Sequence, residues 1–168
     1  PQDSIPYINS QVTFAQILIQ PEIRQTDKER TREKLEDIRS QIIDDGRSFS
    51  SMAALYSMDP GTAKKGGEFD YVGRGTFVPE FDATAFSLKP GEISDLFETS
   101  YGFHILQLIH RRGEQYKGKH ILLIPQVGDK AIEQAAIKAD SILQLIKDDK
   151  YTFSEAAEKF SDDDATKN

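Results

Sequence analysis

The sequence contains no cysteine and only three histidines, and these two scarcities exclude several kinds of site. Without cysteine the chain has no disulfide, no thiolate metal ligand and no cysteine nucleophile. The remaining soft or borderline ligands are His104, His110 and His120, too few to favour a zinc site. We therefore expect no metal centre.

The chain also lacks a basic patch and a long apolar run. Its net charge is −7 and its pI is about 5.0, and no stripe of Lys and Arg with interleaved aromatics is present. This balance disfavours nucleic acid and anionic lipid as partners. No apolar stretch approaches the ~18 residues of a membrane span, and the first four residues do not resemble a signal peptide. Apolar residues recur in periodic blocks, so we expect a soluble, folded protein, and the missing initiator Met suggests a processed or excised fragment.

The most informative feature is an internal repeat. Shifting the chain by 104 positions aligns residues 16–21 (QILIQP) with residues 120–125 (HILLIP) without a gap. The match continues through the following apolar and turn residues, and it places Asp59 on Asp163. A generic strand–helix–helix pattern would mimic part of this match, but not both the core spacing and the turn residues. We therefore predict an N-terminal extension at 1–11, a complete domain at 12–113 and the N-terminal half of a second domain at 116–168.

The complete copy shows strand and helix signals in alternation. The sequence predicts a first strand at 12–19, a long helix capped by Thr26 or Asp27 and stopped at Gly46, and a short helix capped by Ser50. Further strands are predicted at 68–72, 93–98 and 103–109, with a short helix at 78–86 between the first two of these. This order indicates an α+β fold, a small antiparallel sheet with packed helices.

Three stretches of the complete copy resemble the parvulin family of peptidyl-prolyl cis/trans isomerases. They are residues 65–75 (KGGEFDYVGRG), 77–94 (FVPEFDATAFSLKPGEIS) and 99–106 (TSYGFHIL). With the first strand and the turn at Asp59, the resemblance covers residues 12–113, and the tandem copies are similar to SurA-type periplasmic chaperones. It implies a parvulin-like (FKBP-like) fold, no cofactor, and isomerase activity on X-Pro bonds of unfolded extracytoplasmic proteins.

The resemblance also implies a set of site residues. The proline pocket would be aromatic and the groups that orient the amide polar, because twisting an X-Pro amide removes its resonance and its charge separation. By matching position, the polar groups are His104, Asp59, Gln16 and Thr99, and the substrate-binding residues are Phe69, Phe77, Phe81, Phe103 and Tyr101. Each has a plainer interpretation as well: the aromatics as core, His104 as a hydrogen-bonded strand residue, and Asp59 as a turn former before Pro60.

One position departs from the family pattern. Parvulins place a histidine in the first strand, hydrogen-bonded to the second histidine of the site, but Gln16 stands there in this chain. The second copy has His120 at the equivalent position. Glutamine donates and accepts hydrogen bonds but cannot be protonated. This departure motivates an alternative function, a catalytically weak or inactive peptide-binding chaperone domain, and a purely structural domain is a third reading.

The expected partners are unfolded or extended polypeptides that contain proline and aromatic residues. The segment after the first strand carries a single arginine, Arg24, so phosphate-directed specificity is disfavoured. An unpaired sheet edge in the second copy would allow self-association. A periplasmic or extracytoplasmic location follows from the family resemblance alone.

Overall fold

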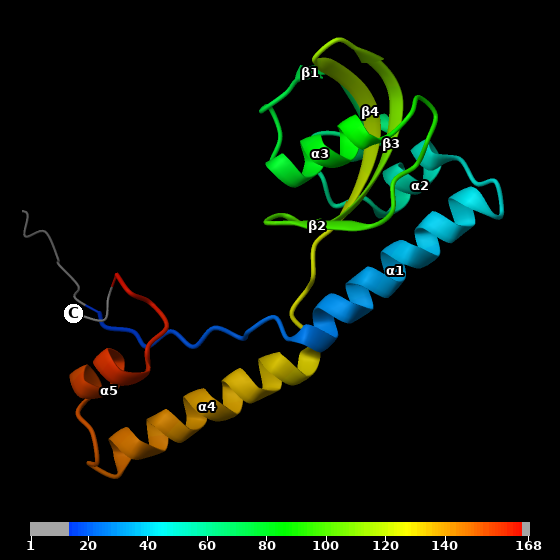
Figure 1. Cartoon of the computed structure of the whole chain (residues 1–168). Coiled ribbons are helices and arrows are strands. Elements are labelled where there is room, and N and C mark those ends of the chain that lie inside the picture. Colours follow the sequence, from blue (N-terminus) through cyan, green and yellow to red (C-terminus); the bar gives the residue numbers. More distant parts are fainter. Residues whose placement is uncertain (1–13, 166–168) are drawn as a thin grey trace, which may run out of the picture. The chain divides into compact units, whose positions relative to one another are not determined.

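The computed structural model describes residues 14–165, which form two compact units. One unit is continuous, Ile23–Gly128, and the other combines residues 14–22 with residues 129–165. Figure 1 labels the elements in chain order. The continuous unit contains α1 (Gln25–Ile43), α2 (Phe49–Tyr56), the 3₁₀ turn η1 (Ala63–Lys65), β1 (Glu68–Gly73), α3 (Pro79–Ser87), β2 (Phe97–Thr99), β3 (Gly102–Arg112) and β4 (Gln115–Leu123), and the other contains α4 (Asp129–Lys147) and α5 (Phe153–Phe160).

The sheet of the continuous unit has four strands in the order β1-β4-β3-β2, and every neighbouring pair is antiparallel. The two central strands, β3 and β4, form a hairpin through the tight turn Gly113-Glu114, where Gly113 has φ +59°. Such a left-handed conformation favours glycine. The predicted α+β class with an antiparallel sheet is confirmed.

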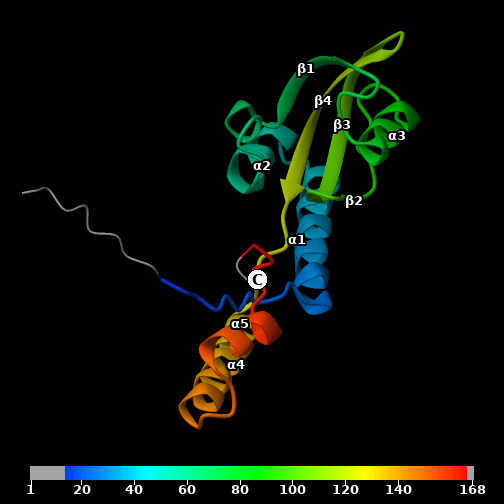
Figure 2. The same cartoon turned by 90° about the vertical axis from the view of Figure 1, so that its left-hand side faces the viewer.

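Helices cover both faces of this sheet (Figure 2). On one face, α1 and α2 pack on β3 and β4 through a core that includes Leu35, Ile38, Phe103, Ile105 and Ile121. On the other face, α3 packs through a second core of seven buried residues: Phe69, Phe81, Ala85, Leu88, Leu106, Leu108 and Tyr116. Successive residues of β3 point to opposite faces, so this one strand supplies both cores.

The strand predicted at residues 12–19 is not part of the sheet over its described residues, 14–19. β4, which carries the second copy of the same sequence pattern, lies beside β3 and β1 instead. The structure's compact units are Ile23–Gly128 and residues 14–22 with 129–165, and the domain bounds predicted from the repeat, 12–113 and 116–168, stay a prediction.

Three positions explain why β4 fits this place better than the first copy of the strand would. A Cβ on Gly118 would lie 2.8 Å from the Gln107 carbonyl oxygen and 3.0 Å from Cζ of Phe69, whereas the first copy has Phe14 at the equivalent position. Tyr116 is fully buried and its hydroxyl donates to Asp82, whereas the first copy has Val12 there. The Lys117 ammonium lies 3.0 Å from the Glu68 carboxylate, whereas the first copy has Thr13. The first copy therefore lacks the small residue, the hydroxyl and the cation that this position in the sheet uses.

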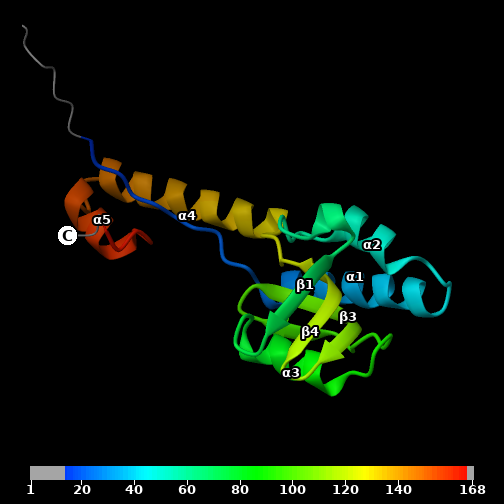
Figure 3. The same ribbon diagram turned by 90° about the horizontal axis from the view of Figure 1, so that it is seen from above.

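The second unit is a smaller assembly of one extended segment and two helices. Residues 14–22 run along α4 and reach the corner between α4 and α5 (Figure 3). Leu18 is held there by two hydrogen bonds, from its own N–H to Ser161 Oγ (3.1 Å) and from the Asp162 N–H to its carbonyl (2.7 Å). This unit contains the helices that the repeat predicts for the second copy.

The ends of several elements differ from the predictions. α1 begins after Arg24 rather than at Thr26 or Asp27, because Asp27 occupies the third helical position and its carboxylate accepts the Arg24 N–H. α2 is capped by Ser48 rather than Ser50. The strand predicted at 93–98 is reduced to β2 and one isolated bridge between Ile93 and Gln107. Among residues 14–165, no helix is long and apolar enough to cross a membrane.

Candidate functional site

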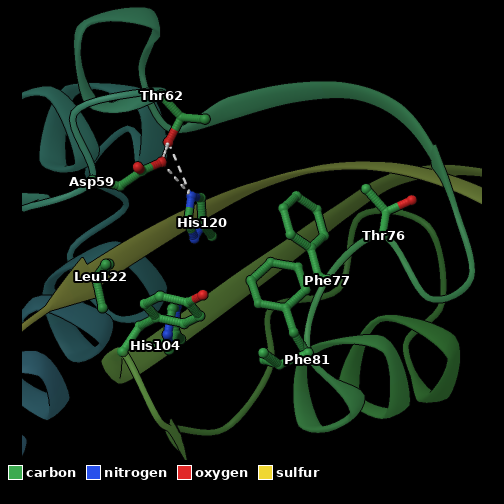
Figure 4. Close-up of a pocket in the computed structure, with 10 residues that line it drawn as sticks. Asp59, Thr62, Thr76, Phe77, Phe81, His104, His120 and Leu122 are labelled. Atoms are coloured by element: carbon green, nitrogen blue, oxygen red, sulfur yellow. Dashed lines mark hydrogen bonds and ion pairs between the residues drawn. The ribbon is translucent and has the colours of Figure 1, made fainter.

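A mostly apolar cavity of about 490 Å³ opens beside the carboxyl-terminal half of β4 (Figure 4). Five parts of the Ile23–Gly128 unit contribute to it: the turn after α2, the connection from β1 to α3, the first turn of α3, the turn between β2 and β3 with the start of β3, and β4. Its ten lining residues are Asp59, Thr62, Thr76, Phe77, Val78, Phe81, Tyr101, His104, His120 and Leu122. Such a hollow, apolar with a few polar groups, is typical of a binding site.

The apolar wall is a cluster of phenylalanines. The rings of Phe77 and Phe81 lie 4.7 Å apart, and Phe69 packs edge-on against both at 5.3 and 5.9 Å. Phe81 is buried by the first turn of α3, where Pro79 at the first helical position presets the backbone. Phe77 is half-buried and lies in the connection just before α3. An apolar ring of five or six atoms can pack against this wall, because the phenylalanine rings have no polar group that would lose its contact with water.

The opposite wall carries a hydrogen-bonded group centred on His120. Its Nε2 lies 2.9 Å from Asp59 Oδ2 and 2.9 Å from Thr62 Oγ1, and the Thr62 hydroxyl also bonds Asp59 (Figure 4). Gly67, with φ +78°, allows β4 to come this close, because a Cβ there would meet the His120 carbonyl oxygen at 2.3 Å. The Gly67 carbonyl in turn accepts the His120 N–H at 3.0 Å. The Gly66-Gly67 pair thus has a structural role in placing His120.

His104 lies beside His120, on β3. Its Nε2 is 2.9 Å from Thr99 Oγ1, which also accepts the Tyr101 N–H. The two imidazole rings are nearly parallel, with centroids 5.8 Å apart. The family pattern leads one to expect a hydrogen bond between them, but the Nδ1 atoms of both rings are buried and make no hydrogen bond within the described structure. Each ring is therefore oriented through its Nε2 atom, by Asp59 and Thr62 or by Thr99.

Both histidines are neutral at physiological pH. Burial lowers the pKa of His104 to about 4, and the neighbouring His120 adds to this effect while Asp59 opposes it. Burial also lowers the pKa of His120, against the hydrogen bond and the charge of Asp59. Burial would raise the pKa of Asp59, but hydrogen bonds from Thr62, His120 and the Gly61 N–H outweigh it and hold that pKa below its usual value. An ionised Asp59 only accepts hydrogen bonds, so His120 carries its proton on Nε2.

A second buried polar group fixes the aromatic wall. The Asp82 carboxylate accepts the Tyr116 hydroxyl and, at 2.6 Å, the Gly75 N–H, and so joins α3, β4 and the loop after β1. Burial and the hydrogen bond to Asp82 raise the pKa of Tyr116, so its hydroxyl stays protonated. The Tyr116 ring also lies 5.9 Å from Phe69 and 6.5 Å from Phe77. This pair therefore holds the loop that carries Phe77.

The structure brings together most of the predicted site residues. Asp59, His104, Phe77, Phe81 and Tyr101 line the cavity. The Phe69 ring packs against the rings of Phe77 and Phe81, and the buried Thr99 hydroxyl forms a hydrogen bond with His104 Nε2. Phe103 is elsewhere: it is buried in the core under α1 and α2, because it neighbours His104 on β3 and points to the opposite face.

Gln16 is not part of the cavity. It belongs to the other compact unit, where its side chain donates to Asp163 Oδ2 at 3.3 Å. His120 takes the place in the cavity that the sequence assigned to Gln16, because β4 rather than the first copy of the strand completes the sheet. His120 could have been found from the sequence, because the repeat aligns it with Gln16. Thr62, Thr76, Val78 and Leu122 also line the cavity and were not predicted.

Comparisons with known proteins identify a family for the sequence. Residues 17–110 and 120–168 match the sequence model of the rotamase family, described as the PPIC-type PPIASE domain. The chain is 46% identical over 66 residues to "Foldase protein PrsA" of Geobacillus kaustophilus, a match that covers 39% of this chain and 24% of that protein. It is 41% identical over 96 residues to "Chaperone SurA" of Pseudoalteromonas translucida, covering 57% of this chain and 22% of that protein. In both cases the match spans about a quarter of the relative's length.

Among solved structures, the chain is similar to that of peptidylprolyl isomerase PrsA from Bacillus anthracis. The identity is 26%, the TM-score is 0.45, and the match covers 65% of this chain and 55% of the other. For the PrsA protein from Bacillus cereus the identity is 21% and the TM-score 0.46, with 81% of this chain and 50% of the other covered.

Proposed function

Because the chain belongs to the PPIC-type peptidyl-prolyl isomerase family, we propose that its cavity catalyses cis–trans isomerisation of X-Pro bonds in extended or unfolded polypeptides. The observation that supports this best is the cavity itself. A phenylalanine wall faces two uncharged, hydrogen-bonded imidazoles across a space of about 490 Å³. That volume suits a proline residue and its flanking amide.

The reaction needs a pocket that favours a twisted amide over a planar one. Rotation about the X-Pro bond opposes a barrier of about 18–20 kcal/mol, because it breaks the partial double bond. The planar amide has a polar, well-hydrated carbonyl, whereas the twisted amide has lost resonance and part of its charge separation. A cavity that removes water from the carbonyl and holds the proline ring therefore stabilises the twisted state relative to the planar one.

The residues divide this work between them. Phe77, Phe81 and Leu122 form the apolar surface against which the proline ring packs. His104 and His120 form the polar wall that faces it, and their neutrality avoids a charge that would favour the planar, more polar amide. Asp59 holds His120 in place and in one tautomer rather than exchanging protons with the substrate. No covalent intermediate and no cofactor enter this scheme.

The alternative of an inactive peptide-binding domain was motivated by Gln16. We propose instead that Gln16 does not limit catalysis, which is supported by His120 lining the cavity and by Gln16 bonding Asp163 in the other unit. The relatives named foldase and chaperone support unfolded polypeptides as substrates. We propose an extracytoplasmic location on the same family grounds. We also propose that the phenylalanine wall favours substrates with an aromatic residue beside proline.

A protease-coupled assay on X-Pro tetrapeptides tests the proposal with three single substitutions in the whole chain. We expect His120→Gln to lower kcat/KM by about tenfold or more, because it removes a ring that packs on Phe69 and Phe81. The chain's own pair of Gln16 and Asp163 shows that glutamine keeps a hydrogen bond to the aspartate, so this variant tests the ring.

The controls are Gln16→His, which should leave the rate unchanged, and His110→Gln, which exchanges the same residue types at an exposed position bonded to Tyr71. No acceleration by the unmodified chain at micromolar concentration would contradict catalysis. If Gln16→His raised the rate and His120→Gln left it unchanged, the result would show that the first copy of the strand completes the site.

A further inference from the structure

A second hollow lies next to the cavity in the larger unit, Ile23–Gly128, and we call it the α1 hollow. Its volume is about 210 Å³, and its lining includes Arg30, Thr31, Lys34, Met58, Ile124 and Gln126. Residues adjacent in the chain divide between the two hollows: Asp59 and Leu122 line the cavity, whereas Met58 and Leu123 line the α1 hollow. Only the turn after α2 and the end of β4 therefore separate them.

The surface between the two hollows is apolar and exposed. Tyr101, which lines the cavity, is 64% exposed, and Met58 and Ile124, which line the α1 hollow, are 40% and 38% exposed. These side chains come from neighbouring parts of the unit. The Ile124 N–H lies 3.2 Å from Met58 Sδ, and a Cβ on Gly102, next to Tyr101, would lie 3.2 Å from the Ile124 Cα. An extended polypeptide bound in the cavity can therefore continue over apolar surface into the α1 hollow.

The far wall of the α1 hollow is basic. Arg30 and Lys34 lie about one turn apart on α1, so they line the hollow from the same face of the helix. Asp27 also lines the hollow, but its side chain is 1% exposed and its carboxylate lies 3.5 Å from Arg24 Nε, so Arg24 offsets its charge. Within residues 14–165, Lys34 forms no salt bridge, and its ammonium lies 5.7 Å from the centre of the Tyr56 ring. A chain with a net charge of −7 thus presents two cations at this place.

We propose that the α1 hollow selects substrates that carry an acidic residue, Glu or Asp, a few positions from the proline held in the cavity. The inference rests on the proposed isomerase function. The carboxylate would bind Arg30 and Lys34, and the aliphatic part of the side chain and the adjoining backbone would lie on Met58 and Ile124. Because an extended chain spans about 3.3 Å per residue, adjacent hollows correspond to a spacing of about two to five residues.

A set of acetylated and amidated peptides tests this proposal, since their only variable carboxylate is one side chain. Each peptide contains one X-Pro bond and one Glu, placed about two to five residues from proline on either side, and the reference has Gln at the same position. Exchange NMR measures catalysed isomerisation by the whole chain, and fluorescence anisotropy measures binding. At one spacing, the Glu peptide should exceed its Gln reference by about three- to tenfold in both readouts, as expected for two exposed ion pairs. This ratio should approach one in about 0.5 M salt, which screens exposed charges.

Two double variants assign the preference to the α1 hollow. Arg30→Gln with Lys34→Gln should lower the ratio of Glu to Gln peptide to about one, because both cations of the basic wall are gone. Arg32→Gln with Arg47→Gln is the matched control, with the same change in net charge. Both of these arginines are exposed outside the hollow, and Arg32 bonds Glu36. The control should keep the full preference.

The outcomes separate this proposal from the proposed function. No preference for Glu at any spacing, a preference that survives in the first double variant, or an equal loss in the control would each overturn the assignment to Arg30 and Lys34. Isomerisation without any such preference would leave the proposed function standing and remove the acidic selection. Preferential binding of a Glu peptide that depends on Arg30 and Lys34, without acceleration of isomerisation, would support the hollow as a binding site and contradict catalysis.

Discussion

Gly118 is the residue of β4 with the least room for a side chain, so it offers a sharp test of which segment completes the sheet. A Cβ there would lie 2.8 Å from the carbonyl oxygen of Gln107 and 3.0 Å from Cζ of Phe69. The first atom belongs to the backbone of β3, and the second to a ring held by Phe77 and Phe81. Neither can move away without disturbing the sheet or the cavity wall.

We expect Gly118→Ala to destabilise the larger unit by about 1–2 kcal/mol. Overpacking of this kind costs about 1–3 kcal/mol, and the lower chain entropy of alanine in the unfolded state returns about 0.4–1 kcal/mol. Gly73→Ala is the matched control: Gly73 also lies in the sheet, opposite Gln115 of β4, but a Cβ there meets nothing within 4 Å. It should be neutral or slightly stabilising.

Urea denaturation followed by far-UV circular dichroism measures both variants. With a slope of about 2 kcal/mol per molar urea, the expected loss lowers the midpoint by roughly 0.5–1 M. Amide hydrogen exchange over residues 115–123 identifies the unit affected. Equal midpoints and equal exchange for the two variants would refute the placement of β4, because Gly118 would then have to lie where a side chain has space.

Two further predictions concern buried polar groups. Because the pKa of His104 falls from 6.5 to about 4 on folding, the unfolded chain binds more protons than the folded chain between these pH values. The free energy of unfolding should therefore fall by up to about 3 kcal/mol as the pH decreases from 6.5 to about 4. Urea midpoints measured across this range check the prediction, and the same pH dependence in His104→Phe would contradict the assignment to His104. Tyr116→Phe removes the hydroxyl donor from Asp82 Oδ1 and should cost about 1–3 kcal/mol of unfolding free energy. Tyr71→Phe, which removes a hydroxyl bonded to the exposed His110, should stay within about 0.5 kcal/mol. Thermal melts of the two variants measure the difference, and equal losses would exclude a special role for the buried pair.

Much of the candidate site followed from residues that are close in sequence. Phe77 lies just before α3 and Phe81 lies in its first turn, so their contact at 4.7 Å joins residues that are only four positions apart. His104 and Thr99 face each other because β2 and β3 form a tight hairpin. Local spacing was misleading at Phe103, where the period of the strand places the side chain on the face opposite His104.

Contacts between distant segments were predictable only in outline. The repeat showed that residues 12–19 and 116–123 carry the same strand pattern, and strand patterns do not specify a partner. The choice depends on single contacts that form in the folded chain, such as the close approach at Gly118 and the bond from Tyr116 to Asp82. The identity of the residue in the cavity, His120 rather than Gln16, depends on that choice.

The sequence by itself determined the family, the α+β class, the duplication and the aromatic character of the pocket, because each depends on residue types and their spacing. Tertiary structure alone decided which of two similar strands completes the sheet, and with it which residue lies beside His104. Both strands satisfy the same period-two pattern, so only the space and the hydrogen-bond partners in the assembled sheet distinguish them.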